Sequence, residues 1–424
     1  MKRLAHLIGL GFVASTTMAT IAFADVTPEA VIAHYADVAE AKYGDALATA
    51  KALDAAIEDF LANPTDETLQ AAKSAWLAAR VPYQQTEVYR FGNAIVDDWE
   101  GRVNAWPLDE GLIDYVDPSY GSESDENSLF TANVVANPSI EVNGKTIDAG
   151  KITPELISAT LQEAGGIEAN VASGYHAVEF LLWGQDLNGN GPGAGSRPAT
   201  DYSLENCTNG NCERRRDYLG SASDLLVADL EEMAANWKAG GAARAALEES
   251  GVAVGLSTIL TGMGSLSYGE LAGQRMKLGL LLGDPEEEHD CFSDNTHNSH
   301  FYDAVGIQSA FSGAYTRPDG TEMTGPSLAS LVAAKDAAIA GELSADLDAT
   351  VTAMEAMVER AEKVEAYDQM IATGNDVGNA TVQAAIDGLI KQTRSIERAI
   401  AALELGTIEL EGSDSLDSPD AVFQ

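Results

Sequence analysis

The chain has 424 residues, 45% of them hydrophobic, so it can bury a large core, and its length suggests about two or three domains. Acidic residues outnumber basic ones by 66 to 25, which gives a formal net charge of −41 at pH 7. Such a surface repels nucleic acid and anionic lipid and attracts cations, although it would also simply solvate a protein in salty water. We therefore expect no nucleic-acid partner.

Residues 1–24 have the pattern of a secretory signal peptide. Lys2 and Arg3 precede an apolar stretch, and an A-x-A cleavage site ends at Ala24. Removing this segment would bring the formal charge from −41 to −43. No later apolar run reaches the roughly 18 residues that a membrane span requires. We expect an exported protein without a transmembrane span, periplasmic or associated with the outer membrane.

Alanine-rich helical periodicity dominates the rest of the chain. It predicts helices over residues 27–63, 66–90, 154–183, 223–237, 242–282, 327–339, 345–373 and 379–405. Asn143-Gly144, flanked by alternating residues, predicts a small β-hairpin. The expected fold is all-α, with two helical-bundle halves and this hairpin as an insertion.

A glycine pair, Gly240-Gly241, divides the helical pattern. We expect an N-terminal helical domain over residues 25–240 and a C-terminal one over 241–408. The stretches SGYHAVEFLLWG and LSYGELAGQRMKLGLLLG each place Tyr, Gly and Glu at the head of an apolar helix, a similarity too short to prove duplication. The acidic, turn-rich tail 409–424 is expected to be disordered.

Two of the three cysteines, Cys207 and Cys212, lie in the turn-rich loop NCTNGNC. In an oxidising compartment they are expected to form a local disulfide, and their spacing does not fit a CxxC metal site. Cys291 is then left over, and we expect it to be a buried free thiol.

Two polar residues interrupt the apolar stretch SGYHAVEFLLWGQD. His176 and Glu179 are three positions apart and share one face of the expected helix. They could be a core pair that hydrogen-bonds to itself. They could also bind a metal, since a cation offsets the cost of burying a carboxylate. An imidazole with carboxylates suits iron(II), zinc or manganese better than calcium.

The expected helix 66–90 offers partners for this pair. The positions that face the core are apolar at the start of this helix, but from Arg80 onward they include ionisable residues, among them Glu87 and Arg90. Such conflicts concentrate at functional sites, although a buried ion-pair network would also explain them. We take Glu87 as the third metal ligand and Arg80 or Arg90 as the group that orients a carboxylate or holds an anionic iron carrier. Asp109 is among the further carboxylates that follow.

The second half contains a polar stretch, EEEHDCFSDNTHNSHFYDAVGI. Within it Asp294 and His297 repeat the three-residue spacing of a carboxylate and an imidazole. Glu270 heads an apolar helix and could meet this cluster across a bundle, which would make a secondary site. The alternative is a solvated loop whose Asp294 caps the next helix.

Several catalytic and binding motifs are absent or incomplete. HExxH does not occur, and the inverted HxxEH pattern fails because Phe180 replaces its second histidine. The segment DLNGNG, residues 186–191, matches the first half of a calcium loop. Its twelfth position is Arg197, where a glutamate is needed, so we interpret it as a surface loop.

The segment GYHAVEFLLWGQD resembles the GxHxxE signature of the imelysin family, also called M75 peptidases, and Gly174, His176 and Glu179 match it without departure. WLAARVPYQQTEVYRFG, the 186–198 loop, ERRRDYL and FSDNTHNSHFYDAVGI are similar to its iron-regulated protein A branch. The resemblance implies an exported all-α protein of two four-helix-bundle-like halves, with a site between them and a connection to iron acquisition.

These features together predict an exported metal-binding protein that acts in iron uptake or sensing. The expected ligand is a divalent metal, iron first and zinc second, free or in an iron carrier. Other periplasmic or outer-membrane iron-uptake proteins are the expected partners. Two alternatives stay open: a metal-dependent peptidase of the M75 type, and a structural or surface-interaction protein in which the motif is a core polar network.

Overall fold

The computed structural model describes residues 26–423, and the predicted signal peptide, residues 1–24, lies outside them. Its α-helices are α1 (Pro28–Ala62), α2 (Asp66–Gln84), α3 (Ala94–Glu100), α4 (Pro154–Leu156), α5 (Gly174–Trp183), α6 (Cys212–Asn236), α7 (Ala242–Glu248), α8 (Val252–Ser265), α9 (Leu278–Leu282), α10 (Thr296–Ser312), α11 (Leu328–Lys335), α12 (Ala337–Lys363), α13 (Tyr367–Ile371), α14 (Asp376–Ala402) and α15 (Asp414–Asp417). Two π-helices are η4 (Ile157–Leu161) and η7 (Leu266–Lys277). The strands are β1 (Ser139–Val142), β2 (Lys145–Asp148), β3 (Ala314–Thr316) and β4 (Glu322–Thr324).

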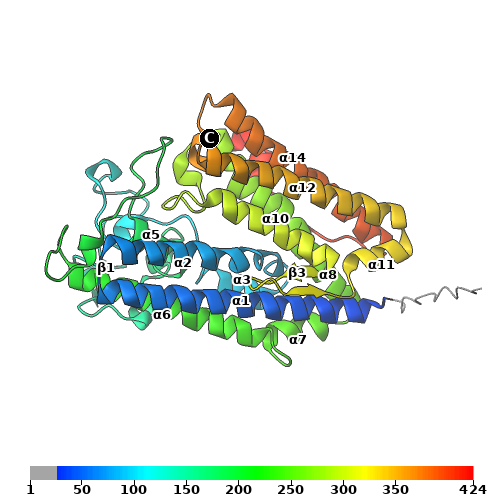
Figure 1. Cartoon of the computed structure of the whole chain (residues 1–424), viewed down its shortest axis with the longest axis horizontal. Helices are drawn as coiled ribbons and strands as arrows, with labels where there is room; N and C mark the ends of the chain where they lie inside the picture. The colour runs from blue at the N-terminus through cyan, green and yellow to red at the C-terminus, as the bar shows by residue number, and fades with distance from the viewer. Residues whose placement is uncertain (1–25, 424) are drawn as a thin grey trace, which may run out of the picture.

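Two groups of long helices pack against each other (Figure 1). In one group α1 lies against α2 and α6, and in the other α12 lies against α14 and α10. Helix α10 also contacts α2, so it joins the groups, and the buried apolar residues form one continuous core. The all-α prediction is therefore confirmed. The domain boundary near Gly240-Gly241 stays a prediction, and α7 and α8, which follow it, both pack on α1.

Several predicted helices were too long. Helix α2 ends at Gln84 instead of residue 90, soon after Pro82, whose ring nitrogen cannot donate a helical hydrogen bond. The predicted helix 154–183 is broken into α4, η4 and α5, and the predicted helix 242–282 is interrupted at Gly251, whose φ is +87°. Periodicity alone did not reveal these breaks because the segments on either side of them remain apolar.

The predicted hairpin is present: β1 and β2 pair antiparallel, with Val142 opposite Lys145. The turn between them places Asn143 and Gly144 at φ values of 51° and 71°, the left-handed region that this dipeptide favours. A second hairpin, β3 with β4, was not predicted, because its strands have only three residues each.

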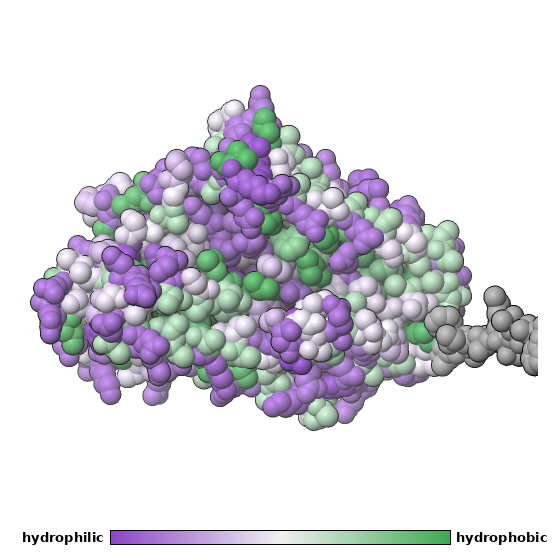
Figure 2. Space-filling view, in the orientation of Figure 1, coloured by the Kyte–Doolittle hydropathy of each residue, from purple (hydrophilic) through white to green (hydrophobic). Residues whose placement is uncertain are grey.

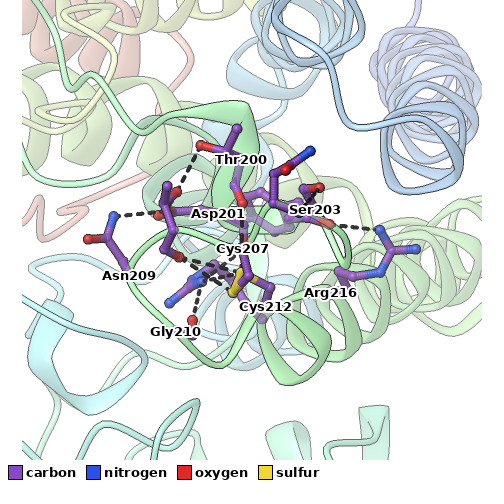
Figure 3. The surroundings of a disulfide bond; sticks show 12 residues. Thr200, Asp201, Ser203, Cys207, Asn209, Gly210, Cys212 and Arg216 are labelled. Carbon is purple, nitrogen blue, oxygen red and sulfur yellow. Dashed lines mark hydrogen bonds between the residues drawn. A yellow bond between two sulfur atoms is a disulfide. The ribbon is translucent and has the colours of Figure 1, made fainter.

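The predicted disulfide between Cys207 and Cys212 is present, in a loop closed by hydrogen bonds (Figure 3). Asn209 donates to Asp201 at 2.8 Å, and Arg215 donates to the Gly210 carbonyl at 2.9 Å. The bridge thus fixes the loop that leads into α6. Cys291 is a free thiol, as expected, but its side chain is only partly buried.

The acidic tail was expected to be disordered, and this expectation was wrong. Its residues up to 423 are described, and part of the tail lies along α8 and η7. A side chain added at Gly264, Gly269 or Gly273 would collide with Leu410, Glu411 or Ser413, respectively. Ser415 donates to the Gly273 carbonyl at 2.8 Å. Glycines on the receiving helices let the tail approach closely, and the composition of the tail gives no sign of this.

Hydrophilic side chains are spread over the face shown in Figure 2, with small hydrophobic patches between them. Among residues 26–423, no single helix has the length and hydropathy to cross a membrane. One bent pair, Ala242–Glu248 with Val252–Leu282, meets both criteria together, with an angle of 116° between its parts.

Candidate metal centre

Helix α5 carries the GxHxxE motif and is buried along its whole length. It begins at Gly174, whose φ of +80° disfavours any other residue. A Cβ atom there would lie 2.4 Å from the Val103 carbonyl oxygen, and Tyr175 donates its backbone N–H to that same oxygen at 2.8 Å. The motif glycine therefore fixes the start of the helix that holds His176 and Glu179.

His176 and Glu179 lie on one face of α5, as their spacing predicts. His176 Nδ1 is 3.1 Å from Glu179 Oε2, and the two side chains are 1% and 0% exposed. Glu179 Oε1 accepts hydrogen bonds from the backbone N–H and the hydroxyl of Ser293, at 3.0 and 2.6 Å. His176 Nε2 is buried and has no hydrogen-bond partner. His176 Nδ1 also lies 3.9 Å from Asp290 Oδ1, so one imidazole nitrogen faces two carboxylates while the other has no hydrogen-bond partner.

The segment between the short 3-10 helix η8 (Pro285–Glu287) and α10 brings two further residues to this point. The rings of His176 and His289 meet edge to face, with centroids 4.7 Å apart. In the described part of the chain, one group of His, Cys, Asp or Glu offers three ligand atoms mutually within 4.8 Å, and it consists of His176, His289 and Asp290. All three side chains are buried, so this group is the candidate metal centre.

Arg80 of α2 holds Asp290 in place. Its Nη2 atom donates to Asp290 Oδ1 at 2.8 Å, and its Nη1 atom donates to Asn104 Oδ1 at 2.6 Å. The other oxygen, Asp290 Oδ2, accepts from Asn295 at 2.8 Å and from the Ser299 hydroxyl. The carboxylate is therefore oriented by groups from both halves of the chain.

Burial and neighbouring charges set the protonation of the centre. Burial, helped by Arg80, lowers the pKa of His176 to about 3, and burial also lowers the pKa of His289 well below its usual value. Burial opposes ionisation of Asp290, yet Arg80 and His289 hold its pKa well below the usual range. At neutral pH the centre offers two neutral imidazoles and one carboxylate, the forms that bind metals. Burial and Asp290 raise the pKa of Glu179.

Glu87, predicted as the third ligand, lies in a different network. It accepts from Arg275 of η7 at 2.8 Å and from the Tyr83 hydroxyl at 3.0 Å. Arg90 belongs to the same network, through Glu270 at 3.5 Å and Asp97 at 2.8 Å. The structure thus brings Glu87, Arg90 and Glu270 together, but around Arg275 and not around His176. Of the two arginines considered, Arg80 is the one that contacts the candidate centre.

The remaining predicted residues lie elsewhere. Asp109 accepts a short hydrogen bond from Asn127. The interpretation of Asp294 and His297 as a solvated loop was wrong, because His297 is 8% exposed and neighbouring His300 is 0% exposed. Asp294 has φ of +56° and does not cap α10, whose N-cap position is Asn295.

Sequence reasoning missed Asp290 and gave His289 no role. The only signal was an adjacent His-Asp pair just before FSDNTHNSHFYDAVGI, the segment that carried part of the family resemblance. Spacing could not link this pair to His176, more than a hundred residues earlier, because the link depends on how the two halves pack.

The imelysin family model, an M75 peptidase family, matches residues 39–396. The chain belongs to the imelysin family. Iron-regulated protein A of Synechococcus elongatus is 37% identical to it over 71 residues, which are 16% of this chain and only 20% of that protein. This membership confirms the resemblance found in the sequence.

Two crystal structures have a similar fold. One is a candidate iron-regulated protein A precursor from Parabacteroides distasonis ATCC 8503, with a TM-score of 0.62 and 18% identity over 90% of this chain and 97% of that one. The other is an imelysin-like protein from Psychrobacter arcticum 273-4, with a TM-score of 0.55 and 17% identity over 92% of this chain and 100% of that one. At these identities the likeness shows the fold alone.

Proposed function

We propose that this protein binds iron(II) through His176, His289 and Asp290 and serves iron uptake or sensing outside the cytoplasm. The observation that carries the proposal is the convergence of these three side chains from two distant segments, within 4.8 Å of one another and all buried. A vacant imidazole nitrogen, His176 Nε2, supports it, because a buried polar atom without a partner is costly.

The donor set fits the metal. Two imidazoles with one carboxylate are the ligand types of non-haem iron(II) sites, and zinc accepts them as well. Glu179 then orients His176: it hydrogen-bonds to Nδ1 of the ring, as partners of metal-binding histidines commonly do. Arg80 plays the matching part for Asp290.

Burial favours metal binding over peptidase activity. The three ligand residues are at most 2% exposed, and a polypeptide substrate would have to reach them between the packed halves. A single ion needs far less space. The name of the Synechococcus elongatus relative, iron-regulated protein A, supports iron as the cargo, and the signal-peptide pattern of residues 1–24 supports export. An iron carrier and other exported uptake proteins are the partners we propose.

The decisive measurement is metal content by elemental mass spectrometry, after anaerobic loading with ferrous iron and desalting. The mature protein should retain about one iron per chain, and the variants His176→Ala and His289→Ala should lose it while keeping the parent's circular dichroism spectrum. His34→Ala is the matched control, because this half-buried histidine hydrogen-bonds to the Gly313 carbonyl, at the opposite end of α10 from the centre. Equal, negligible iron in the parent and all three variants would contradict the proposal and indicate that the GxHxxE motif forms a core polar network.

Glu179→Gln separates direct from indirect roles. If Glu179 only orients His176, this substitution should lower the affinity for iron by about 10- to 100-fold without abolishing binding. Chelator-sensitive cleavage of a protein substrate by the iron-loaded parent, lost in His176→Ala, would instead favour the peptidase.

A further inference from the structure

The loop 186–191 lies at the surface, as predicted, with Leu187 and Asn188 exposed, but it also borders a cavity lined by carboxylates. Arg197, which occupies the twelfth position of the calcium-loop pattern, pairs with the buried Asp114 at 2.7 Å and cannot serve the loop. Carboxylates from other parts of the chain instead gather beside Asp186. With Asp186 itself they form what we call the acidic cavity cluster, which consists of Glu110, Asp186, Glu286, Glu288, Asp294 and Asp368.

A small cavity lies within this cluster. Glu110, Asp186, Glu286 and Glu288 line it together with Gly189, and its volume is about 10 Å³. A space of this size accommodates about one water molecule or one ion. Asp294 and Asp368 are close enough that their charges act on Glu288.

The cluster lacks the counter-ion that other buried carboxylates of this protein have. Asp290 has Arg80, Asp114 has Arg197, and Asp303 has Arg275. Among the described residues, no ion pair with an arginine or lysine involves any of the six carboxylates of the acidic cavity cluster. Burial, helped by neighbouring carboxylates, raises the pKa of Glu110 and of Asp294 to about 7.

Two members of the cluster have carboxylate oxygens deep inside the protein. Glu288 is 1% exposed, and its Oε2 atom has no hydrogen-bond partner. Asp368 is also 1% exposed, and the groups beside its carboxylate are backbone N–H groups at the start of α13, not a cation. Burying such oxygens without a partner costs several kcal/mol unless a cation offsets it. These oxygens are a second observation, besides the concentration of negative charge, that points to a bound cation.

The loop is already tied to the cluster. Asp186 Oδ1 accepts from the backbone N–H of Asn188 at 2.9 Å, and Asn190 donates its side-chain N–H to the Asp368 carbonyl at 2.9 Å. Gly189, at φ of +57°, lines the cavity and has no atom within 4 Å of its Cβ position. The open space at Gly189 therefore leaves room for water molecules beside the carboxylates.

We propose that the acidic cavity cluster binds one Ca²⁺ ion between the loop 186–191, the segment 285–294 and α13. An all-oxygen set of carboxylates, carbonyls and water is what Ca²⁺ takes, whereas the imidazoles of the candidate iron centre suit transition metals. This site is independent of the iron centre in its ligands. The bound Ca²⁺ stabilises the segment that presents His289 and Asp290.

Isothermal titration of the chelator-treated mature protein with CaCl₂ tests the site. The parent should bind one Ca²⁺, and Asp186→Asn and Asp368→Asn should each bind at least tenfold more weakly. Asp59→Asn is the matched control, since it removes the same charge from an exposed position near the end of α1. His176→Ala should bind Ca²⁺ like the parent, which keeps this result separate from that of the iron experiment.

Thermal unfolding of the parent gives a readout that needs no variant: CaCl₂ should raise the melting temperature more than MgCl₂ at the same ionic strength. Three outcomes would overturn the proposal. The first is no binding up to roughly 10 mM CaCl₂, which is beyond the range of weak extracellular calcium sites. The others are unchanged binding in both cluster variants, and equal responses to Ca²⁺ and Mg²⁺, which would indicate screening of the surface charge.

Discussion

Arg80 of α2 and Asp290, just before α10, form a 2.8 Å salt bridge in which the two side chains are 2% and 0% exposed. The bridge links the first group of helices to the segment that supplies two of the three proposed iron ligands. The guanidinium also lies over the ring of Tyr175 at 5.0 Å, at the start of the GxHxxE helix. Stability of the interface and geometry of the metal centre therefore depend on the same pair.

Arg80→Met should destabilise the protein strongly. It leaves the buried Asp290 carboxylate without its cation, and breaking one partner of a buried pair typically costs about 3–5 kcal/mol. Urea unfolding followed by circular dichroism measures the loss. Lys363→Met, which breaks a solvent-exposed pair with Glu359, should leave the unfolding midpoint unchanged. Similar effects of the two substitutions would mean that Asp290 is not ionised in the folded protein.

Gly174→Ala tests whether the first residue of the motif is structural. The new Cβ atom would meet the Val103 carbonyl in a backbone conformation that alanine disfavours, and we expect a loss of at least about 3 kcal/mol. Gly240→Ala is the control, because its φ is also positive, +79°, but nothing lies within 4 Å. That change should cost only about 1 kcal/mol. Equal losses in urea unfolding would show that strain alone, and not contact with Val103, requires the motif glycine.

The sequence was sufficient for the fold class, the hairpin at Asn143-Gly144 and the disulfide, because each depends on local patterns. It also located one of the three residues of the candidate centre, His176, together with its partner Glu179, since the two share one helix and their spacing determines their contact. Glu87 was misplaced for a physical reason: α2 stops after Pro82, so the helical register that aligned Glu87 with Arg80 no longer applies. The contact of His289 with His176 arises only when the two halves pack.

Lys42 should make stability depend on pH. It is fully buried, donates to the Gln85 carbonyl at 3.2 Å and lies near the rings of Tyr89 and Tyr315, and burial lowers its pKa to about 7. Between this value and the unfolded value of 10.5, the unfolded chain binds more protons, so stability should rise with pH.

We expect a rise on the order of 2 kcal/mol between pH 7 and 9, measured by urea unfolding. Lys42→Met should remove the rise and increase stability at pH 7. Lys51→Met, at an exposed lysine paired with Glu231, should keep the parent's slope. A flat profile in the parent would mean that Lys42 finds enough hydration to remain charged.

The C-terminal segment should stabilise η7, the helix that carries Glu270 and Arg275. A protein ending at Gly406 loses the partly buried Ile408 and Leu416 and the hydrogen bond from Ser415 to the Gly273 carbonyl. At roughly 1 kcal/mol for each such contact, the free energy of unfolding should fall by about 2–4 kcal/mol.

A double-mutant cycle isolates the contact between the tail and η7. In the full-length protein, Gly273→Ala would place its Cβ atom 2.2 Å from that of Ser413, so the tail must shift and stability should fall. In the protein ending at Gly406 the Ser413 obstacle is gone and only the Tyr268 carbonyl oxygen, 3.2 Å from the new Cβ atom, stays close, so the same substitution should cost much less. Gly341→Ala in α12, where nothing lies within 4 Å, should act alike in both proteins. Equal effects of Gly273→Ala with and without the tail would show that residues 407–424 do not bind η7 in solution.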